Sequence, residues 1–177
     1  MPQSVRDAGQ LLIRPVTVAD YPHILALNAE FVRFLSPLTP TRLSELHKAA
    51  ELALVVERAG VASAFLLAFR DGAAYDSVNY RWFEERYPSF LYIDRVVIAA
   101  ALQGQGAGSM LYEHVFAHAR KTALPWVTCE IDHEPPNPAS ARFHARFGFR
   151  EVGQQPVPGG KRVSLQAVAT PSEPIAT

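Results

Sequence analysis

The sequence has little of what would mark a secreted or membrane protein. Cys129 is the only cysteine among 177 residues, so no disulfide can form within the chain, and a reducing compartment is favoured. No apolar stretch approaches the roughly 20 residues that cross a bilayer. Residues 1–10 lack the basic-then-apolar order of a signal peptide. We therefore expect a cytoplasmic protein.

An excess of charge of either sign is also lacking. Lys and Arg together number 17, as do Asp and Glu, and no basic run occurs along the chain. A nucleic acid or an anionic membrane is therefore not expected as the main partner, and a small-molecule or protein substrate is favoured. Metal-ligand spacing is missing too, because His133 and His144 do not share a helical turn and lack neighbouring ligands. We predict no metal.

A glycine-rich stretch is the most informative feature that is present. Residues 103–108, Gln-Gly-Gln-Gly-Ala-Gly, follow an apolar run at 91–98 and precede a periodic segment at 109–120. This order predicts a strand, a loop and a helix. Glycines in alternate positions allow backbone N–H groups to converge on an anion at the positive end of the helix. The spacing fits neither G-x-G-x-x-G nor a Walker loop.

Two motifs resemble those of the GNAT superfamily of N-acetyltransferases. Residues 103–108 have the Q/R-x-x-G-x-G/A form that binds the pyrophosphate of coenzyme A in that superfamily. Residues 137–149, one strand later, resemble its second motif, in which an Asn precedes a helix that ends in Gly-Phe. The resemblance implies a mixed α/β fold with a mostly antiparallel central sheet, splayed at the coenzyme A site and flanked by helices. It also implies acetyl-CoA as cosubstrate.

A single domain is expected over residues 11–168, between an N-terminal extension (1–10) and a polar tail (169–177) that is predicted to be disordered. Alternation and turn residues predict strands at 11–14, 53–57, 62–69, 91–98, 126–131 and 161–168. Capping residues and apolar spacing predict helices at about 17–32, 41–51, 109–120 and 137–147.

Residues 73–89 are an insertion relative to a minimal fold of this kind. Their aromatic density is higher than a solvated loop needs, with Tyr75, Tyr80, Trp82, Phe83 and Tyr87. These rings either pack back onto the domain or a second subunit, or they form a wall or lid of the acceptor pocket. Both interpretations can hold together. A homodimer, which many superfamily members form, would have this surface to use.

The resemblance also assigns residues to coenzyme A. The glycine-rich loop would hold the pyrophosphate through Gln103, Gly104, Gln105, Gly106, Ala107, Gly108 and Ser109. The end of the preceding strand would offer main-chain groups to the pantetheine arm at Val96, Val97 and Ile98. The later helix would contribute Asn137, Phe143 and His144, with Asn137 also serving as its N-cap.

Acetyl transfer to an amine requires a base, because an alkyl amine has a pKa near ~10 and must lose a proton before it attacks. Asp94 is the first candidate. Strict alternation along 91–98 would place Asp94 on one face with Tyr92, Val96 and Ile98, opposite Ile93, Arg95 and Val97. The structural alternative is an ion pair with Arg95 or Arg14.

Glu130 and Asp132 form a second carboxylate pair, two residues apart and therefore on one face of the predicted strand at 126–131 and its extension. They are an alternative base or an amine-recognition pair, and carboxylates at strand ends are more often solvated or bonded structurally. His133 adjoins them as a weaker candidate for proton relay.

His144 departs from the superfamily pattern. Many members carry a Tyr four residues before the Gly of the Gly-Phe pair, facing the sulfur of coenzyme A as a general acid. An imidazolium at this position could protonate the thiolate, and an imidazole N–H could hydrogen-bond to it. The alternative is a partly buried histidine that packs against coenzyme A or bonds to a carbonyl. Cys129 lies in a predicted strand without a basic neighbour and is expected to be inert.

Together these features predict an acetyl-CoA-dependent N-acetyltransferase that moves an acetyl group directly to a primary amine of a small molecule or peptide. Asp94, Glu130 and His144 are the predicted catalytic groups. A non-catalytic acyl-CoA-binding or regulatory module of the same fold is the competing class, because the usual Tyr is missing. A partner-binding domain with the aromatic insertion as its interface is a third. No signal in the sequence names the amine.

Overall fold

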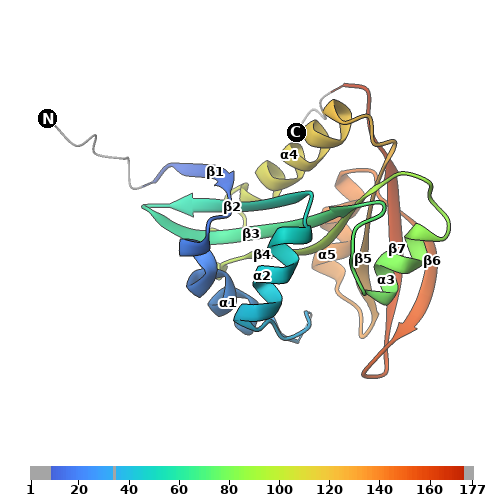
Figure 1. Ribbon diagram of the computed structural model, residues 1–177, viewed down its shortest axis with the longest axis horizontal. Coiled ribbons are helices and arrows are strands. Elements are labelled where there is room, and N and C mark those ends of the chain that lie inside the picture. Colours follow the sequence, from blue (N-terminus) through green and yellow to red (C-terminus); the bar gives the residue numbers. More distant parts are fainter. Residues whose placement is uncertain (1–8, 34, 174–177) are drawn as a thin grey trace, which may run out of the picture.

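A seven-stranded open sheet forms the centre of the computed structural model, which describes residues 9–33 and 35–173 (Figure 1). In spatial order the strands are β1 (Leu11–Pro15), β2 (Leu52–Arg58), β3 (Val61–Arg70), β4 (Leu91–Ile98), β5 (Trp126–Glu134), β7 (Lys161–Ala169) and β6 (Arg150–Val157). Neighbouring strands are antiparallel except β4 and β5, which are parallel. The predicted mixed fold with a mostly antiparallel sheet is confirmed.

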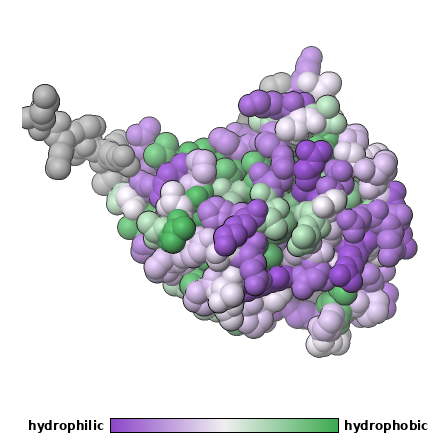
Figure 2. Space-filling model, in the orientation of Figure 1, coloured by the Kyte–Doolittle hydropathy of each residue, from purple (hydrophilic) through white to green (hydrophobic). Residues whose placement is uncertain are grey.

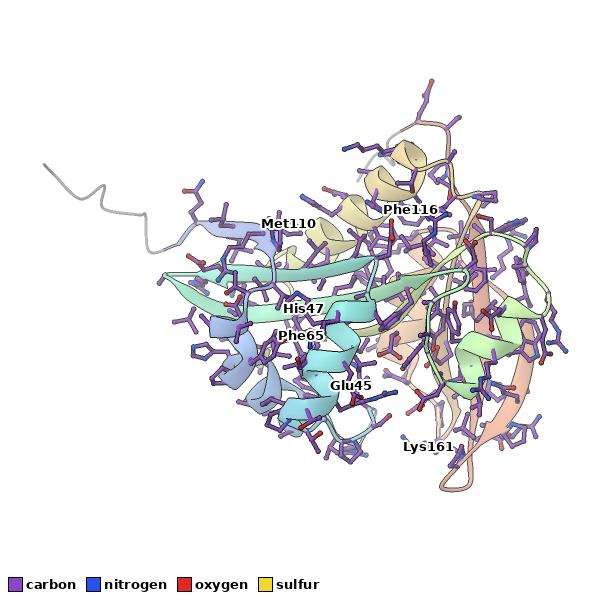
Figure 3. All side chains as sticks on the ribbon, viewed as in Figure 1. Glu45, His47, Phe65, Met110, Phe116 and Lys161 are labelled. Carbon is purple, nitrogen blue, oxygen red and sulfur yellow. The ribbon has the colours of Figure 1, made fainter. Side chains whose placement is uncertain are left out.

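Helices cover both faces of this sheet. They are α1 (Tyr21–Glu30), α2 (Pro40–Ala49), α3 (Val78–Glu84), α4 (Ala107–Lys121) and α5 (Pro138–Arg146). Side chains of α4 and α5 belong to one buried cluster, and side chains of α1, α2 and α3 belong to a second. Figure 3 shows this division, with Met110 and Phe116 on α4 at one side of the strands and Glu45 and His47 on α2 at the other.

Most predicted elements are present, with ends that differ by four residues at most. The predicted capping box lies before the first helix, where the Asp20 carboxylate accepts hydrogen bonds from the Thr17 N–H at 2.8 Å and the Thr17 hydroxyl at 2.9 Å. It begins a short 3-10 turn, η1 (Val18–Asp20), that leads into α1. Local capping chemistry is therefore a reliable guide to this helix start.

Sequence reasoning missed β6 and α3. β6 contains Gly153 and Pro156, which weaken the signal of a strand, and it lies at the edge of the sheet where Pro is tolerated. The seven-residue α3 is too short to show a clear period. The two elements pack closely against each other. A Cβ on Gly153 of β6 would lie 2.6 Å from the Trp82 ring of α3, so a side chain at this position would clash with the ring. That contact joins segments far apart in the chain and leaves no local pattern.

A β-bulge at Asp94 overturns the predicted faces of β4. In the β3–β4 ladder, Ile93 and the residue after Asp94 pair with consecutive residues of β3. Asp94 therefore has no partner residue on β3 and is an extra residue in β4. Ile93 and Val96 consequently pack in the cluster on the α4 side. Tyr92 and Val97 pack in the cluster on the opposite side. The predicted grouping of Tyr92 with Val96 is wrong, because one inserted residue moves every following side chain to the other face.

The aromatic insertion packs onto the domain. Tyr80 and Phe83 of α3 are fully buried in the cluster shared with α1 and α2. Tyr75, which precedes α3, stacks on Phe69 of β3 with 4.3 Å between ring centroids. The insertion therefore extends the core, as one of the two interpretations expected, and Tyr75 also reaches the predicted acceptor side.

The ends of the chain lie partly outside the described residues. This applies to residues 1–8 of the predicted extension and to residues 174–177 of the predicted tail. In the described part, β7 continues to Ala169, and the Thr170 N–H donates to the Pro125 carbonyl at 2.9 Å. The chain thus stays attached to the domain beyond residue 168.

The face of the molecule in Figure 2 is mostly hydrophilic, with small separate hydrophobic patches. Large exposed apolar side chains are spread over several elements, at Leu12, Val18, Val32, Val61, Val78 and Val152. Within the described ranges, no helix combines the length and the apolar character needed to cross a membrane. The homodimer and the cytoplasmic location stay predictions.

Phe83→Ala should lower the free energy of unfolding by about 3–5 kcal/mol, because it empties a fully buried site between α3 and the sheet. Urea unfolding followed by tryptophan fluorescence measures this. Val78→Ala is the matched control on the same helix, 48% exposed, and should change the value by less than about 0.5 kcal/mol. Equal effects would show that the aromatic face does not anchor α3.

Candidate active site

The glycine-rich loop leads from β4 into the N-terminus of α4. After a 3-10 turn, η2 (Ala100–Leu102), the backbone is left-handed at Gly104, with φ 76°, and at Gly106, with φ 84°, which is the N-cap of α4. Side chains rarely tolerate these angles. A Cβ on either glycine would meet no atom within 4 Å, so the space in front of the loop is open there.

The first N–H groups of α4 are available to a ligand. The Met110 N–H donates to the Gly106 carbonyl at 3.0 Å and makes the first bond of the helix. Ala107, Gly108 and Ser109 come before it and have no carbonyl four residues earlier within the helix. Their N–H groups and the helix dipole suit a doubly charged pyrophosphate. The loop therefore fits the predicted pyrophosphate site.

The side chains of Gln103 and Gln105 bond within the loop region. Gln103 Nε2 donates to the Ile98 carbonyl at 3.4 Å, and Gln105 Nε2 donates to the Ala101 carbonyl at 2.6 Å. Gln105 Oε1 accepts a hydrogen bond from Arg58 Nη1 at 3.3 Å. Arg58, at the end of β2, brings a cation beside a loop that has none of its own. Sequence reasoning missed it because it lies 47 residues before Gln105.

The strands β4 and β5 separate at the predicted pantetheine site. Their parallel pairing ends with Ile93 and Cys129. Beyond that point β4 pairs with β3. The backbone groups on the β5 side of Val96, Val97 and Ile98 therefore have no described strand partner. They fit the main-chain bonds that were predicted for the pantetheine arm.

α5 packs close to the loop and to the end of β4. A Cβ on Gly108 would lie 2.9 Å from Ile98 Cδ1 and 3.2 Å from the Phe143 ring, so a larger residue would require these side chains to shift. Asn137 caps α5 by accepting the Ser140 N–H on its Oδ1 at 3.1 Å, which leaves its side-chain NH₂ for another acceptor. The structure thus brings together the loop, the end of β4 and the start of α5, as the resemblance implies.

Asp94 makes the ion pair that was the alternative to a catalytic role. Arg95 Nε lies 2.7 Å from Asp94 Oδ2, and both side chains are 6% exposed. The Tyr75 hydroxyl donates to the other carboxylate oxygen. Arg95 is fixed in turn by Asn28 Oδ1 of α1, at 2.9 Å from its Nη1. Arg14, the other expected partner, pairs with different carboxylates. Both oxygens of Asp94 are therefore occupied by protein donors.

Glu130 has surroundings that suit a base. The Tyr92 hydroxyl donates to Glu130 Oε2 at 2.6 Å. Desolvation and the nearby charge of Asp94 raise the pKa of Glu130 to about 8. The residue remains partly exposed. A carboxylate with this pKa can accept a proton near neutral pH.

Asp132 has a different environment from Glu130. Lys161 Nζ lies 3.1 Å from Asp132 Oδ2 and donates at 2.5 Å to the Arg33 carbonyl after α1. Figure 3 shows Lys161 at the end of β7 farthest from α4. Asp132 therefore forms an ion pair with Lys161 that connects β5, β7 and the segment after α1. His133 is exposed.

His144 is buried with both ring nitrogens engaged. Nδ1 lies 2.8 Å from the Ser140 carbonyl, so the hydrogen-bond pattern assigns the ring proton to Nδ1. Nε2 accepts from the Tyr112 hydroxyl at 2.7 Å. Burial lowers the pKa of His144, which keeps the ring neutral at pH 7. This geometry matches the alternative of a buried histidine bonded to a carbonyl and leaves no ring N–H for a thiolate.

Tyr92 is a contact of Glu130 that sequence reasoning missed, because it lies 38 residues earlier in the chain. Cys129 is buried, and its thiol pKa is raised, which agrees with an inert residue. Within residues 9–33 and 35–173, no group of three or more His, Cys, Asp or Glu is placed to hold a metal ion.

Comparisons of the sequence with known proteins point to acetyltransferases. A sequence model of the Acetyltransferase (GNAT) family matches residues 23–149. A phosphinothricin N-acetyltransferase of Streptomyces coelicolor is 45% identical over 58 residues. Those residues are 33% of this chain and 33% of that protein, so the match spans about a third of the relative's length.

Solved structures share the fold over nearly the whole chain. The ribosomal-protein-S18-alanine N-acetyltransferase of Escherichia coli has a TM-score of 0.67 at 16% identity, covering 95% of this chain and 97% of that one. The yncA protein of Salmonella typhimurium, solved with its cofactor acetyl-CoA, has a TM-score of 0.71 at 20% identity, covering 96% and 99%. At these identities the likeness concerns the fold.

Gly106→Asp should weaken coenzyme A binding by roughly 100-fold or more, because a carboxylate would stand beside the pyrophosphate. Isothermal titration calorimetry with coenzyme A measures this. Gly72→Asp is the matched control, since Gly72 is also left-handed, with φ 77° and open space around a Cβ, but follows β3. It should bind as the unaltered protein does. Full affinity of Gly106→Asp for coenzyme A would show that the loop does not bind the pyrophosphate.

His144→Phe should lower the free energy of unfolding by about 1–3 kcal/mol, because the buried Tyr112 hydroxyl would lose its acceptor. Adding Tyr112→Phe should recover part of that loss, since both partners are then apolar. Urea unfolding of the two variants tests this. A variant with unchanged stability and a kcat reduced more than ~10-fold would instead make His144 the general acid.

Proposed function

Because the chain belongs to the GNAT family of acetyltransferases and uses acetyl-CoA, we propose that it acetylates the primary amine of a small molecule or peptide by direct transfer, with Glu130 as general base. The observation that supports this most is the state of the Glu130 carboxylate. It adjoins the point where β4 and β5 separate, accepts a hydrogen bond from the Tyr92 hydroxyl and has a pKa of about 8.

Different residues of the site bind different parts of acetyl-CoA in this proposal. Bound acetyl-CoA supplies the acetyl group as a thioester. The N–H groups of Ala107, Gly108 and Ser109 hold its pyrophosphate, and the backbone of Val96 to Ile98, which has no partner strand on the β5 side, aligns its pantetheine arm. Asn137 offers its NH₂ to the same arm. These contacts orient the thioester carbonyl beside β5.

Glu130 moves the proton. An alkyl amine is mostly an ammonium at pH 7, with a pKa near ~10, and cannot attack until it loses a proton. Glu130 accepts that proton and passes it to solvent. The neutral amine nitrogen then bonds to the carbonyl carbon, Glu130 accepts the second proton that this nitrogen loses on becoming an amide, and the carbon–sulfur bond breaks. A thiol has a pKa near ~8.5, close to that of Glu130, so Glu130 can return the proton to the departing sulfur.

Asp94 and His144 take supporting parts in this proposal. Asp94 is held by Arg95 and Tyr75, and its charge helps to raise the pKa of Glu130. His144 joins α5 to α4 through its bond to Tyr112. A non-catalytic acyl-CoA-binding module would have no use for a carboxylate tuned in this way, which favours the enzyme over the competing class.

Glu130→Gln should lower kcat by about 10²–10⁴-fold and leave acetyl-CoA affinity unchanged, because the amide cannot accept a proton. The assay is acceptor-dependent release of coenzyme A thiol with a panel of amino acids, polyamines, aminoglycosides and short peptides. Asp132→Asn, two residues along β5, is the matched control and should keep its activity. A loss of activity in Asp132→Asn, together with full activity in Glu130→Gln, would indicate that Asp132 is the base.

The rate should rise with pH and level off above about 8. Glu130 must be ionised to act, and its raised pKa of about 8 leaves it mostly protonated at lower pH, so activity is lost as pH falls through that value. The measurement is kcat against pH at saturating acceptor. A plateau already reached near pH ~5 would indicate an ordinary carboxylate as the base.

A further inference from the structure

We infer that Arg58, at the end of β2, pairs with a phosphate group of coenzyme A and supplies the positive charge that the glycine-rich loop lacks. The inference concerns how the cosubstrate is held, and it does not depend on which residue is the base. It rests on the proposed role of the loop at residues 103–109 in holding the pyrophosphate, which Gly106→Asp tests separately.

The loop and the first turns of α4 carry no basic side chain. Residues 99–113 contain no Lys, Arg or His. The first position of the loop motif, which is Gln or Arg in the superfamily form, is Gln103 here, and its side-chain amide bonds to the Ile98 carbonyl at 3.4 Å. Within this segment, a doubly charged pyrophosphate would meet backbone N–H groups but no full positive charge. A cation from another element would therefore add to its binding.

Gln105 holds the guanidinium of Arg58 beside the loop. Gln105 Nε2 donates to the Ala101 carbonyl at 2.6 Å, and Gln105 Oε1 accepts from Arg58 Nη1 at 3.3 Å. Because a side-chain amide has one oxygen acceptor and one NH₂ donor, the bond to Ala101 turns the oxygen toward Arg58. A guanidinium has five N–H donors, and the bond to Gln105 uses one of them. Donors remain for a phosphate oxygen at the loop.

The backbone that carries Arg58 is held in a fixed place relative to the loop. Arg58 is the last residue of β2, and a tight turn of Ala59 and Gly60 joins it to β3. Both turn residues are left-handed, with φ 50° and 82°, as in the two-residue turns that keep hairpin strands in register. The Ala99 N–H, just before the loop, donates to the Ser63 carbonyl of β3 at 2.9 Å. The hairpin and the loop are thus attached to each other.

The charge of Arg58 is not neutralised by a carboxylate of the described chain. Within residues 9–33 and 35–173, no Asp or Glu forms an ion pair with Arg58. The adjacent carboxylate, Glu57, is 7% exposed and accepts from Arg14 Nε at 2.7 Å. Arg58 itself is partly exposed, so an anion in solution can reach it. The planar fork of donors on a guanidinium matches the oxygens of a phosphate group.

The test measures coenzyme A affinity by isothermal titration calorimetry for a charge series at residue 58. Arg58→Lys keeps the charge and should retain most of the affinity. Arg58→Gln should weaken binding roughly 10-fold, because a hydrogen bond between charged groups is lost. Arg58→Glu should weaken it further, since a negative charge would then face the phosphate. Added salt should weaken binding to the unaltered protein more than binding to Arg58→Gln.

Arg70→Gln is the matched control. Arg70 lies at the other end of β3 from the hairpin turn, its side chain is 44% exposed, and its substitution should leave coenzyme A affinity unchanged. Circular dichroism confirms that each variant is folded. Dephospho-coenzyme A, which lacks the 3′-phosphate, distinguishes the two phosphate sources. A loss in Arg58→Gln that persists with this ligand assigns Arg58 to the pyrophosphate, and a loss that disappears assigns it to the 3′-phosphate.

Affinity that falls in the order Lys, Gln, Glu at residue 58, with no loss in Arg70→Gln, supports the inference. Full affinity in folded Arg58→Gln and Arg58→Glu overturns it. Equal losses in all three Arg58 variants also overturn it, because packing and not charge would then explain them. An equal loss in Arg70→Gln overturns it as well, since the effect would not be specific to the loop.

The Gly106→Asp variant separates this inference from the role of the loop. If Gly106→Asp loses affinity while Arg58→Gln and Arg58→Glu bind fully, the loop still holds the pyrophosphate and only the inference about Arg58 fails. If Gly106→Asp binds coenzyme A with full affinity, the proposed role of the loop fails, and the inference fails with it.

Discussion

The separation of β4 from β5 beyond Ile93 is the constraint on which the rest of the site depends. A fully paired sheet would use every backbone group of the central strands, and none would be left for a ligand. Because β4 pairs with β3 alone after this point, its other edge has no partner strand at Val96 to Ile98, where the Ile98 carbonyl accepts from the Gln103 side chain. The glycine loop and α4 begin directly beyond that edge, and Glu130 follows the last residue of β5 that pairs with β4. The gap thus places the predicted cosubstrate groups and Glu130 within one part of the fold.

The acceptor side combines buried charge with close packing. Asp94 and Arg95 are both nearly inaccessible, and their cost of desolvation is offset by their mutual pairing and by bonds from Tyr75 and to Asn28. This arrangement leaves Glu130 beside a fixed negative charge. The same aromatic insertion that fills the core on this face supplies the Tyr75 hydroxyl to Asp94. The packing of the core and the surroundings of the buried carboxylate therefore depend on one segment of the chain.

Local features of the sequence were enough to predict a cosubstrate site and most elements. Glycines at fixed spacing between a strand and a helix, and an Asn-Pro helix start, act through neighbouring backbone atoms, so they can be interpreted without tertiary information. The candidate catalytic residues depended on side-chain direction, which local reasoning does not give. The bulge at Asp94 reversed the predicted faces of β4. For His144 the sequence left open a role at a sulfur or a buried histidine bonded to a carbonyl, and its two nitrogens meet Ser140 and Tyr112.

The sequence by itself determined the family, the cosubstrate and the order of most elements, because each rests on residues close in the chain. Only the tertiary structure showed how the two candidate carboxylates differ. Asp94 is bonded by Arg95, its neighbour in the chain, and by Tyr75, whereas Glu130 accepts a hydrogen bond from Tyr92 of another strand. The pKa of a carboxyl group follows from desolvation and from the charges and donors around it, and those exist only once the chain has folded.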